Sequence, residues 1–170
     1  MPEPVTTTGV PGPEERLQDA LDRAYRYLAM RDRTEHEMRS QLERVGVDAS
    51  TIEEAVRVLT DLEYLDDARF AVRFAQDRRV LDAWGAERIE RRLTVLGIDR
   101  DHVRAALAED SGDRPLGPGG ELERALVLLR RRFPEPPSDR RGRERALGVL
   151  IRKGYESELA LEALARWSRS

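Results

Sequence analysis

The chain has 170 residues, enough for one ordinary domain or a short row of helical repeats. Charged residues make up 37% and hydrophobic residues 39%, a balance that favours a thin helical array over a thick globule. The absence of cysteine excludes disulfides and thiolate metal sites, and no apolar run is long enough to span a bilayer. The first residues lack the pattern of a signal peptide, so we expect a cytoplasmic protein.

The net charge of −3 is unevenly distributed along the chain. Residues 1–65 carry 8 basic and 14 acidic side chains, whereas residues 117–170 carry 12 basic and 8 acidic ones. All basic residues except Lys153 are arginines, whose planar guanidinium can bind a carboxylate or a phosphate through two hydrogen bonds. Because a dedicated DNA-binding protein is usually basic overall, a protein or a nucleoprotein is the expected ligand.

The N-terminal part of the chain predicts a tail followed by helices. Residues 1–12 are rich in Pro, Thr and Gly and are expected to be disordered. Pro13, a residue suited to a first helical turn, is expected to begin the first helix. Thr34 and, three residues later, Glu37 predict a capping box at the start of the next helix. Gly46 is expected to end that helix in a conformation with positive φ.

The middle of the chain predicts further helices, and it shows none of the sustained alternation that is typical of strands. Trp84 follows Val80 and Leu81 in what we expect to be a loop, before a helix that Gly85 begins. A tryptophan at this point predicts either a plug over a junction between modules or an anchor for a partner, and we prefer the plug.

An internal repeat is the strongest structural signal in the sequence. A leucine, any three residues, a glycine and then a large apolar residue recur three times, at Leu42 to Val47, Leu93 to Ile98 and Leu150 to Tyr155, and the three glycines are 51 and then 57 residues apart. A pattern that recurs at intervals of roughly 50 residues indicates tandem helical modules. We therefore predict an all-α, elongated array of three three-helix repeats. The predicted parts are a disordered tail (1–12), module 1 (13–63), module 2 (64–109), a Gly- and Pro-rich linker (110–120) and module 3 (121–170).

No pattern of residues indicates catalysis, a metal site or a cofactor. The two histidines, His36 and His102, are 66 residues apart and have no metal-type partner at helical spacing. Residues 117–120 resemble a phosphate-binding loop only in their glycines, because the Lys-Ser/Thr ending and the preceding strand are missing. We therefore predict no catalytic residue, no metal and no cofactor, and the chain is not expected to be an enzyme.

Clusters of basic residues are the candidate binding site. Cations at the end of a helix are favoured by the helix dipole, but the cluster between Arg140 and Arg145 lies at a predicted helix start, where cations are disfavoured. A partner that offers carboxylates or phosphates would explain that cluster, and a solvated helix face is the equal alternative. The candidate residues are Arg78, Arg79, Arg91, Arg92, Arg130, Arg131, Arg132, Arg140, Arg141, Arg143, Arg145, Arg152 and Lys153.

Three segments of the chain resemble a known protein family. The stretch from Tyr64 to Arg78 (YLDDARFAVRFAQDR) is similar to the central signature of RecX regulatory proteins. The stretch from Arg33 to Gly46 resembles their first-module motif, and the stretch from Gly85 to Ile98 resembles their second-module helix. The three segments occur in the family's order, and the resemblance extends from about Ala20 to Leu107, while module 3 matches only in outline.

This resemblance implies a non-enzymatic modulator of RecA recombinase in DNA repair, recombination and the SOS response. Proteins of this family bind the RecA–ssDNA filament, lie along its groove and limit filament extension, ATP hydrolysis and strand exchange. The implied partners are the RecA filament and either ssDNA or dsDNA, with no membrane, and the protein is expected to act as a monomer. The alternatives are a direct DNA-binding helical protein and a helical-repeat scaffold for another protein.

Overall fold

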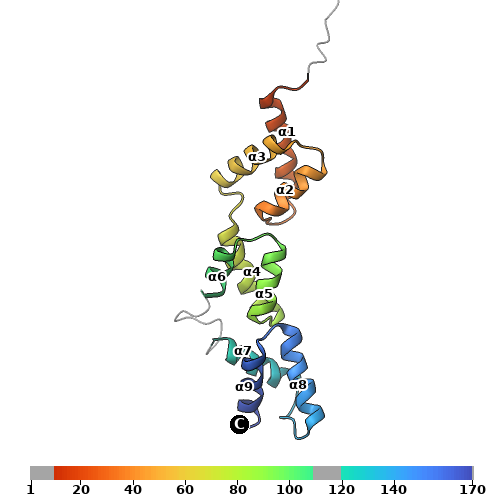
Figure 1. Cartoon of the computed structure of the whole chain (residues 1–170), viewed down its shortest axis with the longest axis vertical. Helices are drawn as coiled ribbons and strands as arrows, with labels where there is room; N and C mark the ends of the chain where they lie inside the picture. The colour runs from red at the N-terminus through yellow and green to blue at the C-terminus, as the bar shows by residue number, and fades with distance from the viewer. Residues whose placement is uncertain (1–9, 109–119, 170) are drawn as a thin grey trace, which may run out of the picture. The chain divides into compact units, whose positions relative to one another are not determined.

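The computed structural model describes residues 10–108 and 120–169, and within these ranges the chain forms nine α-helices and no strand. The all-α prediction is therefore confirmed (Figure 1). Residues 110–119 of the predicted linker (110–120) and residues 1–9 of the predicted tail (1–12) lie outside the described residues, and Gly120 is already helical. The helices are α1 (Pro13–Leu28), α2 (Glu35–Arg44), α3 (Ala49–Asp61), α4 (Asp67–Asp82), α5 (Ala86–Val95), α6 (Arg100–Ala108), α7 (Gly120–Arg132), α8 (Arg140–Lys153) and α9 (Ser157–Trp167).

The chain divides into two compact units, residues 1–66 and residues 67–170. Helices α1 to α3 belong to the first unit and enclose one apolar core, centred on side chains such as Met38, Leu42 and Leu59 that are fully buried. The second unit contains two cores: one is formed around Ile89 and Leu93 by α4 to α6, and the other is formed by α7 to α9. Each set of three consecutive helices thus buries its own apolar faces.

The start of α2 is fixed by the capping box that the sequence predicts. The Thr34 hydroxyl accepts a hydrogen bond from the Glu37 backbone N–H at 3.1 Å, and the Glu37 carboxylate accepts one from the Thr34 N–H at 3.1 Å. Burial of the Glu37 carboxyl opposes its ionisation, but hydrogen bonds from Arg31 and from the Thr34 backbone outweigh burial and lower the pKa of Glu37. The carboxylate therefore stays charged at the positive end of the helix dipole.

Replacing Thr34 with alanine should destabilise the first unit by about 1–2 kcal/mol, because the Glu37 N–H would lose its acceptor in a position where water cannot replace it. Thr94→Ala is the matched control, since the exposed Thr94 hydroxyl bonds only the Glu90 carbonyl within its own helix, and it should change stability by less than about 0.5 kcal/mol. Urea unfolding followed by far-UV circular dichroism measures both values. Equal losses in the two variants would contradict a capping role for Thr34.

The glycines of the repeat end their helices as the sequence predicts. Gly46, Gly97 and Gly154 have φ of 85°, 79° and 88°, which lie in the left-handed region that favours glycine. In each case the following residue donates its N–H back to the helix, as when Tyr155 bonds the Leu150 carbonyl at 3.1 Å. The repeated Leu-x-x-x-Gly pattern is therefore a helix-ending signal with a common backbone geometry.

The loop predicted at Trp84 is present, and it spans only residues 83–85 between α4 and α5. Val80 and Leu81, which precede this loop, lie in the last turn of α4. Their side chains are 59% and 71% exposed, so they depart from the apolar stripe of the helix upstream. These two exposed aliphatic side chains border the site described below.

Candidate binding surface of the second unit

The second unit joins its two cores through the ends of α5 and α8. The C-terminal carbonyls of α8 accept hydrogen bonds from the N-terminal amides of α5: Gly85 N–H bonds Lys153 O at 2.8 Å, and Glu87 N–H bonds Gly154 O at 3.1 Å. The two glycines pack so closely that a Cβ on either one would overlap backbone atoms across the junction. The unpaired ends of two helices thus satisfy each other, with their dipoles aligned.

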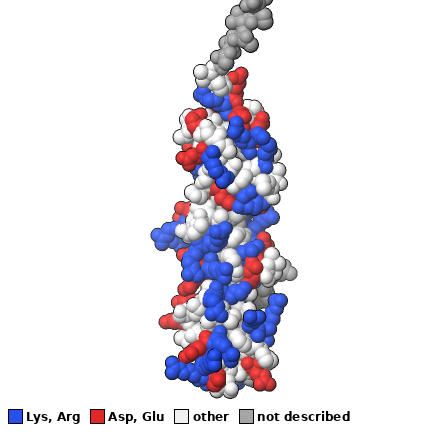
Figure 2. Space-filling view, turned by 90° about the vertical axis from the view of Figure 1, so that its right-hand side faces the viewer, with Lys and Arg blue, Asp and Glu red and all other residues white. Residues whose placement is uncertain are grey.

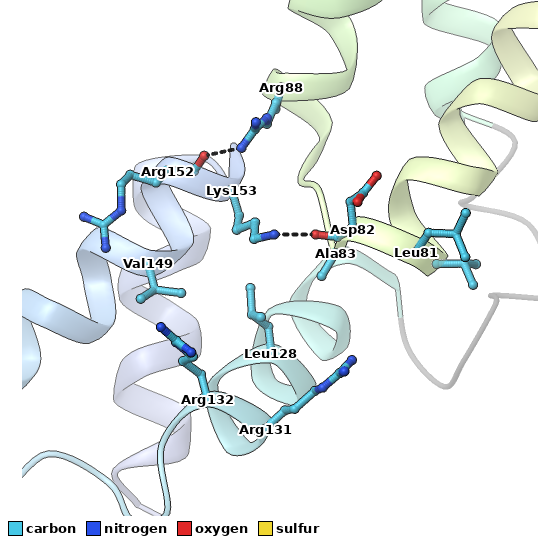
Figure 3. A pocket seen from close by; sticks show the side chains of 11 residues that line it. Leu81, Asp82, Ala83, Arg88, Leu128, Arg131, Arg132, Val149, Arg152 and Lys153 are labelled. Carbon is cyan, nitrogen blue, oxygen red and sulfur yellow. Dashed lines mark hydrogen bonds between the residues drawn. The ribbon is translucent and has the colours of Figure 1, made fainter.

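Side chains add further bonds across this junction (Figure 3). The Lys153 ammonium donates to the carbonyl oxygen of Asp82 at 2.7 Å, and Arg88 Nη1 donates to the carbonyl oxygen of Arg152 at 3.0 Å. The Arg88 guanidinium also lies over the ring of Trp84, 4.3 Å from its centroid. Trp84 is half-buried against the same residue that bonds α8, and this placement favours the predicted plug over the predicted partner anchor.

A tyrosine lies buried beside the junction. Tyr155 follows Gly154, its side chain is fully buried, and its hydroxyl has no hydrogen-bond partner among the described residues. Burial raises the pKa of Tyr155 to about 12. The Glu121 carboxylate nearby is engaged by the backbone N–H of Ala86 at 2.7 Å, which is another bond between the two cores.

The raised pKa of Tyr155 predicts a loss of stability at high pH. The unfolded chain ionises this phenol near pH 10, whereas the folded protein keeps it neutral, so stability present below pH 10 should fall by on the order of 1–3 kcal/mol as the pH rises to about 12. Tyr155→Phe should remove this pH dependence and should leave stability at pH 7 unchanged or raise it by up to about 1 kcal/mol. Urea unfolding at a series of pH values measures the difference, and parallel curves for the two proteins would contradict the assignment.

The structure brings part of the predicted basic set together around one pocket. This junction pocket has a volume of about 560 Å³. Its basic side chains come from the end of α7 (Arg131, Arg132), the end of α8 (Arg152, Lys153) and α5 (Arg88) (Figure 3). The pocket is also lined by six other residues: Val80, Leu81, Asp82, Ala83, Leu128 and Val149.

The arginines between Arg140 and Arg145 lie at the other end of α8 from the junction pocket. A helix of 14 residues separates the two ends by about 20 Å. The start of α8 is capped by Asp139, whose carboxylate accepts from the Gly142 N–H at 2.7 Å, and Arg140 pairs with Glu144 at 2.8 Å. The basic residues of the third module therefore form two separate groups.

Two of the predicted binding residues are engaged inside the unit. Arg78 pairs with Asp82 at 2.5 Å, and its guanidinium lies 5.6 Å from the ring centroid of Phe74. Arg79 is only 6% exposed and donates to the carbonyl of Leu107 at the end of α6. Their placement favours an intramolecular role, because each already satisfies its charge or its hydrogen bonds within the fold.

Most of the other predicted arginines are exposed and uncompensated. Nine of them form no ion pair within 4 Å in the part of the chain that the structure describes, and basic side chains gather on the face of the second unit with acidic ones among them (Figure 2). Guanidinium groups that lack an internal partner are free to bind an external anion. These residues are Arg91, Arg92, Arg130, Arg131, Arg132, Arg141, Arg143, Arg145 and Arg152.

Sequence reasoning missed Arg88 and the contact between Gly85 and Gly154. Arg88 bonds a carbonyl 64 residues away, and no local pattern marks such a partner. The glycines were identified as helix boundaries, but their close approach depends on the tertiary packing of two modules. Only a comparison of related sequences carries a signal for contacts of this kind.

Within residues 10–108 and 120–169, no group of three or more His, Cys, Asp or Glu side chains is placed to hold a metal ion. None of the helices in these ranges is long and apolar enough to cross a membrane.

Comparisons with known proteins place the chain in a family. Family models match two parts of it: "RecX, first three-helix domain" matches residues 20–57, and "RecX, third three-helix domain" matches residues 120–164. The chain is 32% identical over 140 residues to the regulatory protein RecX of Xanthomonas campestris pv. campestris (strain B100), an alignment that covers 82% of each protein. The chain belongs to the RecX family.

Other RecX proteins agree with this assignment. The chain is 28% identical over 172 residues to the regulatory protein RecX of Mycobacterium sp. (strain KMS), covering 96% of this chain and 91% of the relative. The crystal structure of RecX from Lactobacillus salivarius has the same fold, with a TM-score of 0.78 and 19% identity over 92% of this chain and 99% of that one. A second crystal structure, of a regulatory protein RecX, has a TM-score of 0.69 and 22% identity, covering 86% of this chain and 70% of that one.

Membership of the RecX family confirms the resemblance seen in the sequence, and the match of residues 120–164 to the third three-helix domain extends it to module 3. The relatives are named regulatory proteins, so a regulatory role is the coarse function that the family supports.

Proposed function

We propose that this RecX chain binds the RecA–ssDNA filament as a monomer in the cytoplasm and inhibits filament extension, ATP hydrolysis and strand exchange. The observation that carries the proposal is its 32% identity to a regulatory protein RecX over 82% of the chain. The exposed, uncompensated arginines of the second unit support it, because they supply a surface for an anionic partner.

The charge distribution favours a nucleoprotein over bare DNA. The chain as a whole carries a net charge of −3, which opposes strong binding to a polyanion alone. A filament that combines protein with DNA offers carboxylates, phosphates and apolar surface at the same time. The second unit carries arginines without ion pairs and, beside some of them, exposed aliphatic side chains, which suits such a mixed target.

A second candidate function, direct binding to DNA, is favoured by the start of α8. Arg141, Arg143 and Arg145 are exposed near the positive end of the helix dipole, where cations gain nothing from the helix itself. Phosphates would compensate these charges, and binding of this kind weakens steeply as salt is raised.

Co-sedimentation tests the proposal and separates it from the alternatives. The full chain is spun with RecA assembled on ssDNA, with ssDNA alone and with neither, at low and at high salt. The proposal predicts that the chain pellets with the filament and that far less pellets with ssDNA alone. Equal pelleting with bare ssDNA would favour direct DNA binding. Absence from the filament pellet would contradict the proposal and favour a scaffold for another protein.

A further inference from the structure

The junction pocket combines basic and aliphatic side chains in one concave surface. Its cations are Arg88, Arg131, Arg132, Arg152 and Lys153, and its only carboxylate among the described lining residues is that of Asp82. Asp82 is paired with Arg78 at 2.5 Å, so it compensates none of the arginines at the ends of α7 and α8. The pocket is therefore net positive and lacks an internal counterion.

Two of the three helix ends at the pocket have their last carbonyls hydrogen-bonded. Unpaired C-terminal carbonyls would attract the cations and repel an anion. At the end of α4 the Asp82 carbonyl accepts from the Lys153 ammonium, and at the end of α8 the carbonyls of Arg152 and Lys153 accept from Arg88 and from the Gly85 N–H. The guanidiniums of Arg131 and Arg132, at the end of α7, form no ion pair with a described residue and remain available to a ligand.

The other side of the pocket is aliphatic. Val80 and Leu81 are 59% and 71% exposed, and Leu128 and Val149 are half-buried. Figure 3 shows Leu128 and Arg132 of α7 directed toward Val149 of α8. Exposed aliphatic side chains beside unpaired cations favour a ligand that brings apolar and acidic groups together.

The lining argues against single-stranded nucleic acid as the occupant. Proteins that hold single strands offer aromatic rings on which bases stack, and the lining of the pocket contains no aromatic residue among the described ones. The nearby indole of Trp84 has the Arg88 guanidinium over its ring and packs against Phe74 in a T-shaped arrangement, with ring centroids 6.3 Å apart. A volume of about 560 Å³ lies within the usual size of a small-ligand pocket and suits a few residues of a peptide.

We propose that the junction pocket is a docking site for an acidic peptide segment with aliphatic side chains, contributed by the protein component of the filament. Arg131 and Arg132 bind its carboxylates, and Leu81 and Leu128 contact its aliphatic side chains. This inference rests on the proposed function. It assigns the junction pocket to contacts with protein and leaves the arginines at the start of α8 to bind the phosphates of the DNA.

The test uses the full chain and a fluorescein-labelled peptide of alternating glutamate and leucine, with fluorescence anisotropy as the readout. Saturable binding is expected, and Arg131→Gln/Arg132→Gln should weaken it by roughly tenfold or more. Leu81→Ser should weaken it by roughly threefold. A peptide with glutamine in place of glutamate should bind far more weakly to the unaltered chain.

The matched control is Arg100→Gln/Arg104→Gln, which removes two exposed arginines of α6 outside the pocket. This variant should bind the peptide with an affinity within twofold of that of the unaltered chain. The comparison separates an effect of the pocket from an effect of the lower net charge. Equal weakening by both double variants, or no saturable binding, would overturn the inference. So would a loss of oligo-dT binding in Arg131→Gln/Arg132→Gln that exceeds the loss of peptide binding, because the pocket would then serve nucleic acid.

The peptide experiment contains no RecA, so its outcome is independent of the proposed function. Filament binding without peptide binding would reject only the pocket assignment. In the filament assay, Arg131→Gln/Arg132→Gln should reduce pelleting with the filament and leave the small amount bound to ssDNA alone unchanged. Full pelleting by this variant would count against the pocket as a docking site.

Discussion

Gly154→Ala should destabilise the second unit by about 2–5 kcal/mol. Gly154 has φ of 88°, and a non-glycine residue in the left-handed region costs about 1–2 kcal/mol. An added Cβ would also overlap the backbone of Arg88, which the hydrogen bonds between α5 and α8 hold in place, and overpacking of this kind costs typically 1–3 kcal/mol. Both tryptophans, Trp84 and Trp167, lie in the second unit, so their fluorescence during urea unfolding reports its stability.

Gly46→Ala separates the cost of the left-handed backbone conformation from the cost of the steric overlap at the junction. Gly46 has nearly the same φ, 85°, but a Cβ there has open space around it, so this variant should lose only about 1–2 kcal/mol by circular dichroism. Gly85→Ala provides the converse case, because Gly85 has φ of −80° and its Cβ would meet the backbone of Gly154 and Tyr155. Losses of equal size for Gly46→Ala and Gly154→Ala, with no loss for Gly85→Ala, would contradict a close-packed junction.

Replacing Arg140, Arg141, Arg143 and Arg145 together with alanine should weaken filament binding by roughly tenfold or more. Three of these side chains have no ion pair in the part of the chain that the structure describes, and Arg140 pairs only with the exposed Glu144. Their removal therefore costs the fold little, while a polyanionic partner loses up to four contacts. The dependence of binding on salt should become shallower, because fewer counterions are released.

The control for this variant removes four exposed arginines from elsewhere in the chain: Arg44, Arg57, Arg100 and Arg104. It has the same net charge and should bind the filament within about twofold of the unaltered chain, since these side chains lie outside the proposed surface. Co-sedimentation at several salt concentrations compares the two variants. If both bind equally well, the cluster at the start of α8 has no specific role and is a solvated helix face.

The parts of the fold that obey local rules could be predicted from the sequence. Pro13 begins α1, and Thr34 and Glu37 cap α2, because these residues act on a backbone only a few positions away. Gly46 and Gly154 adopt positive φ for the same local reason. The repeat of these signals was sufficient to predict an all-α chain of three-helix units.

The features that depend on long-range packing could not be predicted. Val80 and Leu81 were not identified as part of a binding surface, because the basic residues beside them in the junction pocket come from α5, α7 and α8. The burial of Arg79 against Leu107 and the bond from Arg88 to α8 connect residues far apart in the sequence. The basic residues and the helix start at Arg140 were identified from the sequence, but only the fold shows that the ends of α7 and α8 meet around one pocket.

The most direct test of the central claim, that this RecX chain inhibits the RecA filament, is the steady-state rate of ATP hydrolysis by RecA on ssDNA as the full chain is added. The account predicts that the rate falls toward a low plateau, and that the variant lacking Arg140, Arg141, Arg143 and Arg145 needs a markedly higher concentration to lower it. An unchanged rate at saturating amounts of the unaltered chain would contradict the account.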